Sequence, residues 1–167
     1  MKKELKNPLF VMQGFPQTII SVRDAKGRNN ALAVGSITNV NTNPPMMLIG
    51  IAPSRYSHHM IKENPCFVIN LPEKNYRKEY GFLGSVSGAD VDKFETLEIR
   101  WEDAEHVNAP LLTDCPVNIE CSVVDSNTLL YHELFVGKIE KVHVDEKYLD
   151  KNGRILWDKM DLIGVWA

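Results

Sequence analysis

The stretch from residue 29 to residue 71 carries three apolar segments in close succession, separated by turn-forming residues. Residues 30–40 (NALAVGSITNV) and 46–52 (MMLIGIA) flank an Asn-Pro-Pro turn, and residues 66–71 (CFVINL) follow a short polar stretch. Apolar runs of this length, bounded by Gly, Pro and Asn, are typical of buried β-strands. The chain must therefore build a sheet whose interior holds these strands.

Further strands are predicted on both sides of this stretch. Residues 15–23 (FPQTIISVR) are β-branched and form a hairpin with residues 30–40 through a turn centred on Gly27. A short strand is predicted at residues 97–102. With only two predicted helices, these strands indicate a mainly β chain with helical insertions, folded as an antiparallel barrel or sandwich.

The longest predicted hairpin lies in the second half of the chain. Residues 115–125 alternate in polarity, a turn is expected at residues 125–128 (DSNT), and residues 129–144 return with a bulge near Gly137. One helical turn and then a further turn and strand are expected after residue 145. The alternation points one set of side chains inward and another outward: inward are Cys115, Val117, Ile119, Cys121 and Val123, and outward are Asn118, Glu120 and Ser122.

Two helices and a loop are predicted between the strands. Residues 54–64 form a short helix that Ser54 or Ser57 caps, and Pro65 ends it. Its residues Met60 and Ile61 are expected to pack inward. Residues 71–84 carry apolar side chains at helical spacing, and residues 84–95 (GSVSGADVDKFE) have the composition of a loop.

Length and charge limit the function classes. The 167 residues are most simply one domain, spanning residues 1–167. A net charge of −3 and the absence of a basic run argue against a nucleic-acid partner. No segment has the apolar character of a signal peptide or membrane span, so a cytoplasmic protein without a membrane partner is expected.

Several common kinds of site are not favoured. The three cysteines have no C-x-x-C spacing, so they predict neither a disulfide framework nor a zinc site. The pair His58 and His59 has no third ligand nearby, and both are interpreted as surface or ligand-contacting residues, with no metal. GxGxxG, GxxxxGK[ST], HExxH and GxSxG motifs are all missing.

One cluster of residues does indicate a ligand. Ser54, Arg55, Tyr56, Ser57 and the two histidines open the helix at residues 54–64. A guanidinium group, hydroxyls and the free N–H groups of a helix N-terminus together favour an anion, and phosphate is the expected one.

Two other segments allow both a structural and a functional interpretation. Small residues on the strand at 30–40, such as Gly35, permit close approach either of a flat ligand or of a neighbouring helix. In the loop at 84–95, Ser87, Gly88 and Lys93 offer hydroxyl, N–H and ammonium groups, although a surface loop has the same composition. Composition alone favours the structural interpretation of both segments.

Four motifs in register resemble a known family. They are N-A-x₄-S-x-T-x₅-P-P at residues 30–45, R-Y-S-x₃-I-x₅-F-V-I-N-L at 55–71, G-x₂-S-G-x₃-D-K-F at 84–94, and H-x-L-F-V-G-K-I at 132–139. Together they are similar to the flavin reductase-like family of FMN-binding split barrels, flavoredoxin included. The resemblance covers about 130 residues and implies an antiparallel, Greek-key-like split β-barrel.

The resemblance also implies a homodimer with FMN near the subunit interface, and a set of residues around it. Gly35 to Thr38 would border the flavin ring, and two separate loops would hold the phosphate. The implied cofactor-binding residues are Asn30, Gly35, Ser36, Ile37, Thr38, Arg55, Tyr56, Ser57, Asn70, Leu71, Ser87, Gly88, Lys93 and Phe94.

The implied activity is an oxidoreductase of the flavin reductase type. It would pass hydride from NAD(P)H to FMN, and electrons onward to free flavin, ferric iron, oxygen or a protein. His132 matches a histidine associated with the nicotinamide side, but Tyr131 precedes it where the family often has an acidic residue or glycine. The alternative is therefore a flavoredoxin-like carrier that a protein partner reduces, and a barrel without flavin is a third hypothesis.

Overall fold

The chain folds around one antiparallel sheet, described by a computed structural model for residue 3 and residues 15–164. Seven strands follow the order β2-β1-β5-β8-β9-β4-β3, and every neighbouring pair is antiparallel. Their bounds are β1 (Thr18–Arg23), β2 (Asn29–Val34), β3 (Ile37–Thr42), β4 (Pro45–Ile51), β5 (Cys66–Leu71), β8 (Val117–Thr128) and β9 (Glu133–Val144). A separate two-stranded sheet joins β6 (Trp101–Asp103) to β7 (Pro110–Leu112).

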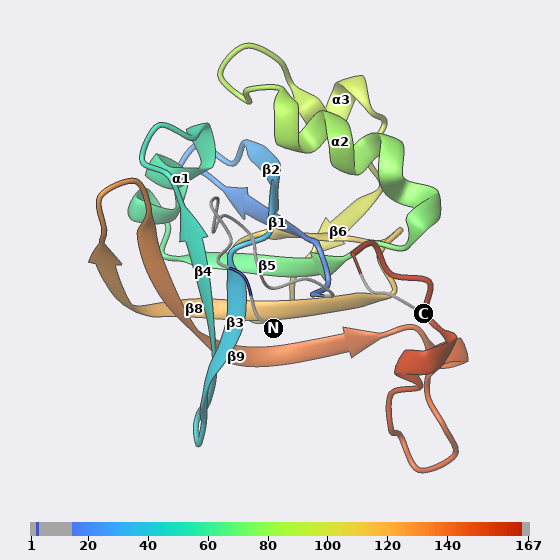
Figure 1. Cartoon of the computed structure of the whole chain (residues 1–167). Helices are drawn as coiled ribbons and strands as arrows, with labels where there is room; N and C mark the ends of the chain where they lie inside the picture. The colour runs from blue at the N-terminus through green and yellow to red at the C-terminus, as the bar shows by residue number, and fades with distance from the viewer. Residues whose placement is uncertain (1–2, 4–14, 165–167) are drawn as a thin grey trace.

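Short helices cover parts of this sheet (Figure 1). They are α1 (Tyr56–Glu63), α2 (Arg77–Ser85) and α3 (Lys93–Thr96), with single 3₁₀ turns η1 (Lys74–Tyr76), η2 (Glu146–Tyr148) and η3 (Trp157–Lys159). Figure 1 shows α2 and α3 together on one side of the molecule, and both contact β2. The prediction of an antiparallel, mainly β fold with helical insertions is confirmed.

The apolar core lies on both sides of the central strands. In β1, Ile20 belongs to the barrel core with Phe67 and Phe135, whereas Ile19 belongs to a second cluster with Leu83 under α2. Successive side chains of a strand point to opposite faces, so a strand covered on both faces reads as one continuous apolar run. This is why β1 and β5 carry buried residues at nearly every position.

The predicted single strand at residues 30–40 is wrong, because the chain divides there into β2 and β3. Strand β2 pairs with β1 at one edge of the sheet, and β3 pairs with β4 at the other. The chain must change direction between them, and it does so at Gly35 and Ser36. The expected alternation of faces therefore ends at Val34, and the β3 residues after Ile37 are exposed.

The long hairpin differs from the prediction in two ways. Strand β8 continues through residues 125–128, so the DSNT segment is strand and the turn lies at residues 129–132. The expected bulge lies opposite Gly137, but its extra residue is Val124 of β8. After residue 145 the expected helical turn is η2, while the predicted strand is reduced to a single bridge between Leu149 and Ile155.

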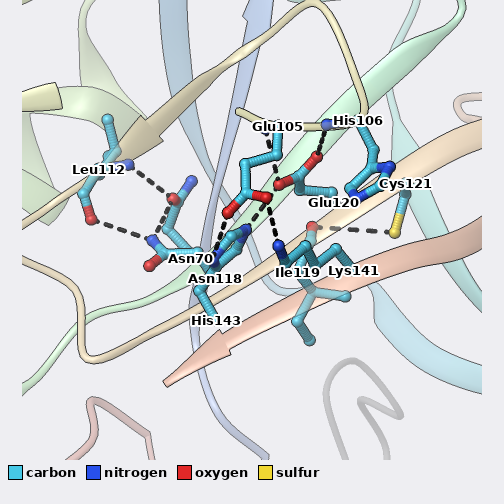
Figure 2. A network of polar contacts seen from close by, with 10 residues as sticks. All are labelled: Asn70, Glu105, His106, Leu112, Asn118, Ile119, Glu120, Cys121, Lys141 and His143. Atoms are coloured by element: carbon cyan, nitrogen blue, oxygen red, sulfur yellow. Dashed lines mark hydrogen bonds and ion pairs between the residues drawn. The ribbon is translucent and has the colours of Figure 1, made fainter. Parts of the chain in front are cut away.

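Asn118 and Glu120 also differ from the prediction, because neither is exposed. The alternation of β8 correctly places both on the face opposite Val117, but the segment containing β6 and β7 covers that face. Figure 2 shows the resulting polar network, in which Asn118 bonds to Asn70 and Leu112, and Glu120 accepts from the backbone N–H of His106.

Both predicted helices form where they were expected, but their caps and bounds differ from the prediction. Helix α1 buries Met60 and Ile61 as expected, but its N-cap is Arg55 and no side chain caps it. The predicted helix at residues 71–84 consists of η1 and α2. The predicted loop at residues 84–95 contains α3, whose N-cap Asp92 accepts hydrogen bonds from two backbone N–H groups.

All three cysteines, Cys66, Cys115 and Cys121, are buried and form no disulfide within the described residues. In residues 15–164, none of the helices has the length and apolar character that crossing a membrane requires.

Candidate functional site

A pocket opens where β2, the N-terminus of α1 and the segment from α2 to α3 meet. Seven of the residues implied to bind the cofactor line it, although they come from three separate segments: Asn30, Arg55, Tyr56, Ser57, Ser87, Gly88 and Lys93. The remaining lining residues are Leu32, Ala33, Ser54, Leu83, Gly84 and Val86. We call this the anion pocket, because of the charges described next.

Lys93 is the strongest charge feature of the anion pocket. It belongs to α3, is 4% exposed, and its Nζ donates to the carbonyl oxygens of Ala31 and Leu83, each at 2.9 Å. An ammonium group has three N–H donors, and residues 15–164 provide acceptors for two of them. Burial, and then the nearby Arg55 guanidinium, lower the pKa of Lys93 to about 8.

No carboxylate is among the described residues that line the anion pocket. Arg55 and Lys93 are therefore two neighbouring positive groups without an acidic counter-charge in the pocket wall. Buried charge normally requires a partner. The arrangement favours an anionic ligand that accepts a hydrogen bond from Lys93.

The N-terminus of α1 forms another wall of the pocket. Asn30 of β2 fixes it by donating from Nδ2 to Ser57 Oγ at 2.8 Å, and both side chains are buried. Since no side chain caps α1, its first N–H groups remain available beside Arg55. Free N–H groups at a helix N-terminus attract anions.

Gly88 closes the pocket from the opposite side. A Cβ atom built on Gly88 would lie 2.5 Å from Asn30 Oδ1, so an alanine there would displace the asparagine. The same segment approaches β2 at Gly84, where a Cβ atom would lie 3.1 Å from the Cβ of Ala33. The small residues on β2 thus allow the α2–α3 segment to approach closely, as one of the two sequence interpretations held.

A second group of predicted residues gathers at the corner between β2 and β3. A Cβ atom on Gly50 of β4 would lie 3.1 Å from the Cβ of Ser36 and 3.8 Å from Cδ2 of His132. Ser36, Leu134 and His132 therefore pack around the bare backbone of Gly50, with the Leu134 Cδ2 atom 3.4 Å from the same Cβ position. Gly35, Ser36 and Thr38 are exposed and Ile37 is half-buried, while His132 lies in the exposed hairpin turn.

Three further predicted residues belong neither to the described lining of the anion pocket nor to the corner between β2 and β3. Asn70 is fully buried, and its amide bonds to Ile19, Ser21, Leu112 and Asn118. Leu71 packs in the barrel core, and Phe94 packs in the cluster under α2, edge-on to Trp101. The side chains of these three residues hold the fold together. The sequence alone does not distinguish this structural role from a contact with the cofactor.

Sequence reasoning missed the environment of α1. Both histidines were expected to be surface or ligand-contacting residues. His59 is exposed, whereas His58 is half-buried and its Nε2 lies 2.7 Å from Glu133 Oε2. The guanidinium of Arg28 lies 5.7 Å from the ring centre of Tyr56, a lining residue of the pocket. Partners this far apart in the chain leave no local signal.

Known proteins are similar to this chain in both sequence and structure. A model of the flavin reductase like domain matches residues 12–159. The structure is similar to flavoredoxin from Methanosarcina acetivorans, with 31% identity, a TM-score of 0.88, and coverage of 100% of this chain and 94% of that one. Flavoredoxin of Desulfovibrio vulgaris gives 28% identity, a TM-score of 0.86, and coverage of 93% and 82%.

A curated relative adds an activity at lower identity. The NADH:riboflavin 5′-phosphate oxidoreductase of Streptomyces pristinaespiralis is 26% identical over 122 residues, which are 73% of this chain and 66% of that protein.

Proposed function

Since this chain belongs to the flavin reductase-like family, we propose that it is an oxidoreductase that binds FMN and passes electrons from NAD(P)H to an acceptor. The observation that carries the proposal is the anion pocket, where the buried ammonium of Lys93 lies near Arg55 without a lining carboxylate. A phosphate monoester supplies the missing negative charge and several acceptor oxygens.

The pocket residues fit the phosphate of FMN. Lys93 offers its third N–H, and Arg55 offers a guanidinium that can bind two phosphate oxygens. Ser57 and the free N–H groups of α1 complete one side, and the segment with Ser87 and Gly88 completes the other. Gly88 can lie against Asn30 because it lacks a side chain, and this close approach brings the Ser87–Gly88 segment to the pocket wall.

When bound, FMN supplies the acceptance and release of electrons. The residues of this chain would bind and orient it. The corner at Gly35 to Thr38 would border the flavin ring, and the bare backbone at Gly50 lets Ser36 and His132 lie close together there. His132, exposed in its turn, would lie on the side from which the nicotinamide approaches.

The acceptor in this proposal is free flavin, ferric iron, oxygen or a protein. A cytoplasmic location and a homodimer with FMN near the subunit interface belong to the same proposal. The exposed apolar residues Leu129, Leu130 and Tyr131, next to His132, support an interface at this end of the hairpin. Sedimentation equilibrium with and without FMN tests the dimer, and a monomer in both conditions would contradict it.

The second candidate function is an electron carrier that holds FMN and takes electrons from a protein partner. The similarity to two flavoredoxins supports it. Tyr131, which is 81% exposed beside His132, also supports it, because a large exposed ring crowds the approach of a nicotinamide.

The test is the visible absorption spectrum of the purified protein with FMN, recorded without oxygen. Addition of NADH and then NADPH should bleach the bound flavin with one of them. Bound flavin that stays yellow with both would reject the reductase and favour the carrier. Lys93→Met should bind FMN weakly, whereas Lys78→Met, an exposed residue of α2, should bind it normally.

A further inference from the structure

The side chain of Gln17 lies at the corner between β2 and β3, against the bare backbone of Gly35. A Cβ atom built on Gly35 would lie 3.0 Å from Gln17 Oε1 and 3.7 Å from its Nε2. Gly35 and the next residue, Ser36, are exposed, whereas Gln17 is half-buried. Gln17 is not among the residues that the family resemblance implies, so this corner holds a polar group that the motifs do not include.

Three contacts hold the Gln17 side chain in place. The hydroxyl of Tyr80 in α2 donates to Gln17 Oε1 at 3.0 Å. The Cγ atom of Gln17 lies against the backbone of Gly164, where an added Cβ atom would approach it to 2.8 Å. The backbone N–H of Gln17 donates to the carbonyl oxygen of Ile163 at 2.8 Å. The amide is therefore fixed within the fold, and a ligand that contacts it does not have to order it.

The nitrogen of this amide is left for a ligand. Because Tyr80 occupies Oε1, the N–H groups on Nε2 are the remaining polar part of the Gln17 side chain, and Nε2 makes no hydrogen bond to residues 15–164. Among the described residues, every buried side-chain nitrogen or oxygen atom has a hydrogen-bond partner. The unpaired Nε2 is therefore accessible, and it can donate to an acceptor that approaches the corner.

The corner continues the anion pocket along two elements. Ala33 lines the pocket, and Gly35 follows two residues later, about 7 Å further along extended backbone. On α2, Gly84 lines the pocket, and Tyr80 lies about one helical turn before it. A ligand whose phosphate is held in the anion pocket can therefore place its remaining part beside Gln17.

We propose that Gln17 is a further cofactor-contacting residue, whose Nε2 donates a hydrogen bond to a carbonyl oxygen of the flavin ring. This inference rests on the proposed function, because it takes FMN to be the ligand of the anion pocket. The pyrimidine ring of a flavin has carbonyl groups at C2 and C4, and reduction increases the electron density on their oxygens. A fixed donor at such an oxygen stabilises the reduced form more than the oxidised form.

The experiment is ¹³C NMR of FMN labelled at C2 and C4 and bound to the full chain. Gln17→Met keeps an unbranched side chain of similar length, so the packing against Gly164 is preserved. This variant should shift one of the two carbonyl resonances upfield, because that carbonyl loses its donor. FMN affinity in a fluorescence titration should fall about fivefold, the effect of one neutral hydrogen bond. Carbonyl resonances identical to those of wild type would overturn the proposal.

A second variant tests the same contact without changing Gln17. Tyr80→Phe removes the hydroxyl that fixes Oε1, and should move the same resonance in the same direction by a smaller amount. The matched control is Asn75→Met, an exposed amide of η1 outside the described pocket lining, which should leave both resonances unchanged. Wild-type protein that binds no FMN would reject the proposed function itself. Normal FMN binding with no effect of Gln17→Met on the resonances would reject only the role of Gln17.

Discussion

The Nε2 atom of His58 lies 2.7 Å from a carboxylate oxygen of Glu133, and this contact joins α1 to the first residue of β9. Lys62, one turn further along α1, reaches the other oxygen of the same carboxylate at 2.7 Å. Glu133 is buried, so two donors of one helix satisfy one buried acceptor. The contact fixes the helix whose N-terminus forms the anion pocket against the hairpin that carries His132.

Glu133→Gln should destabilise the fold by about 1–3 kcal/mol at pH 7, because it weakens two hydrogen bonds to a buried carboxylate. The matched control is Glu63→Gln, an exposed acid of the same helix without an ion pair among the described residues. Urea unfolding measures both. A variant as stable as the control would contradict the role assigned to the ion pairs.

The contribution of Glu133 should depend on pH in a defined direction. Hydrogen bonds, first of all that from Lys62, lower its pKa from 4.5 to about 2. A carboxyl group with a lowered pKa in the folded state adds stability above its unfolded pKa and loses it as the pH falls. The stability difference between wild type and Glu133→Gln should therefore shrink between pH 5 and pH 2. A constant difference across this range would contradict the prediction.

FMN affinity should fall as the pH rises through the pKa of Lys93. Burial, and then Arg55, lower that pKa to about 8, so the free pocket loses its buried charge between pH 7 and pH 9.5. Fluorescence titration with FMN should show weaker binding over this interval, and Lys93→Met should remove the dependence. Riboflavin, which has no phosphate, is the ligand control. A steeper loss for riboflavin than for FMN would reject the phosphate assignment.

Gly88→Ala should weaken FMN binding about tenfold, because the new methyl group displaces Asn30 and with it the hydrogen bond to Ser57. Gly81→Ala is the control, since a Cβ there meets nothing within 4 Å. That change lies in α2 and should stabilise the fold by about 0.5–1 kcal/mol. Isothermal titration and thermal unfolding separate the two effects, and equal FMN affinity in both variants would contradict the close approach.

Asn70→Ala should lower stability by about 2–4 kcal/mol, because it leaves the N–H of Leu112 and the amide of Asn118 without their acceptor. Folded protein should still bind FMN with nearly the wild-type Kd, since the Asn70 amide is used within the fold. The exposed Asn75→Ala variant is the control for stability. A large loss of affinity in folded Asn70→Ala would instead support the direct flavin contact implied by the family resemblance.

The resemblance of four motifs predicted much of the candidate site, because motif residues are recognised without knowing the fold. It named the three segments that meet at the anion pocket, including Lys93. The loop composition around Lys93 did not indicate burial. The residue is buried because α3 packs against β2, a contact between segments about sixty residues apart.

The alternation in β8 predicts correctly which side chains share a face, but it does not determine whether that face is exposed. Asn118 and Glu120 do point away from Val117, but exposure depends on what covers the face. The covering segment, with β6 and β7, is short, and its backbone N–H groups bond to Glu120. Polar residues on such a face look the same in sequence whether water or a backbone donor satisfies them.

The sequence by itself determined the approximate positions of most strands of the large sheet and of α1, and the family to which the chain belongs, since apolar periodicity, turn residues and motifs are local properties. Only the tertiary structure decided that the chain leaves β2 for the opposite edge of the sheet, and that a second face of β8 is buried. It also brought Arg55 and Lys93, which lie far apart in the sequence, to one positively charged pocket. These features arise from pairing between distant strands, and the free energy of such pairing depends on partners that no local pattern identifies.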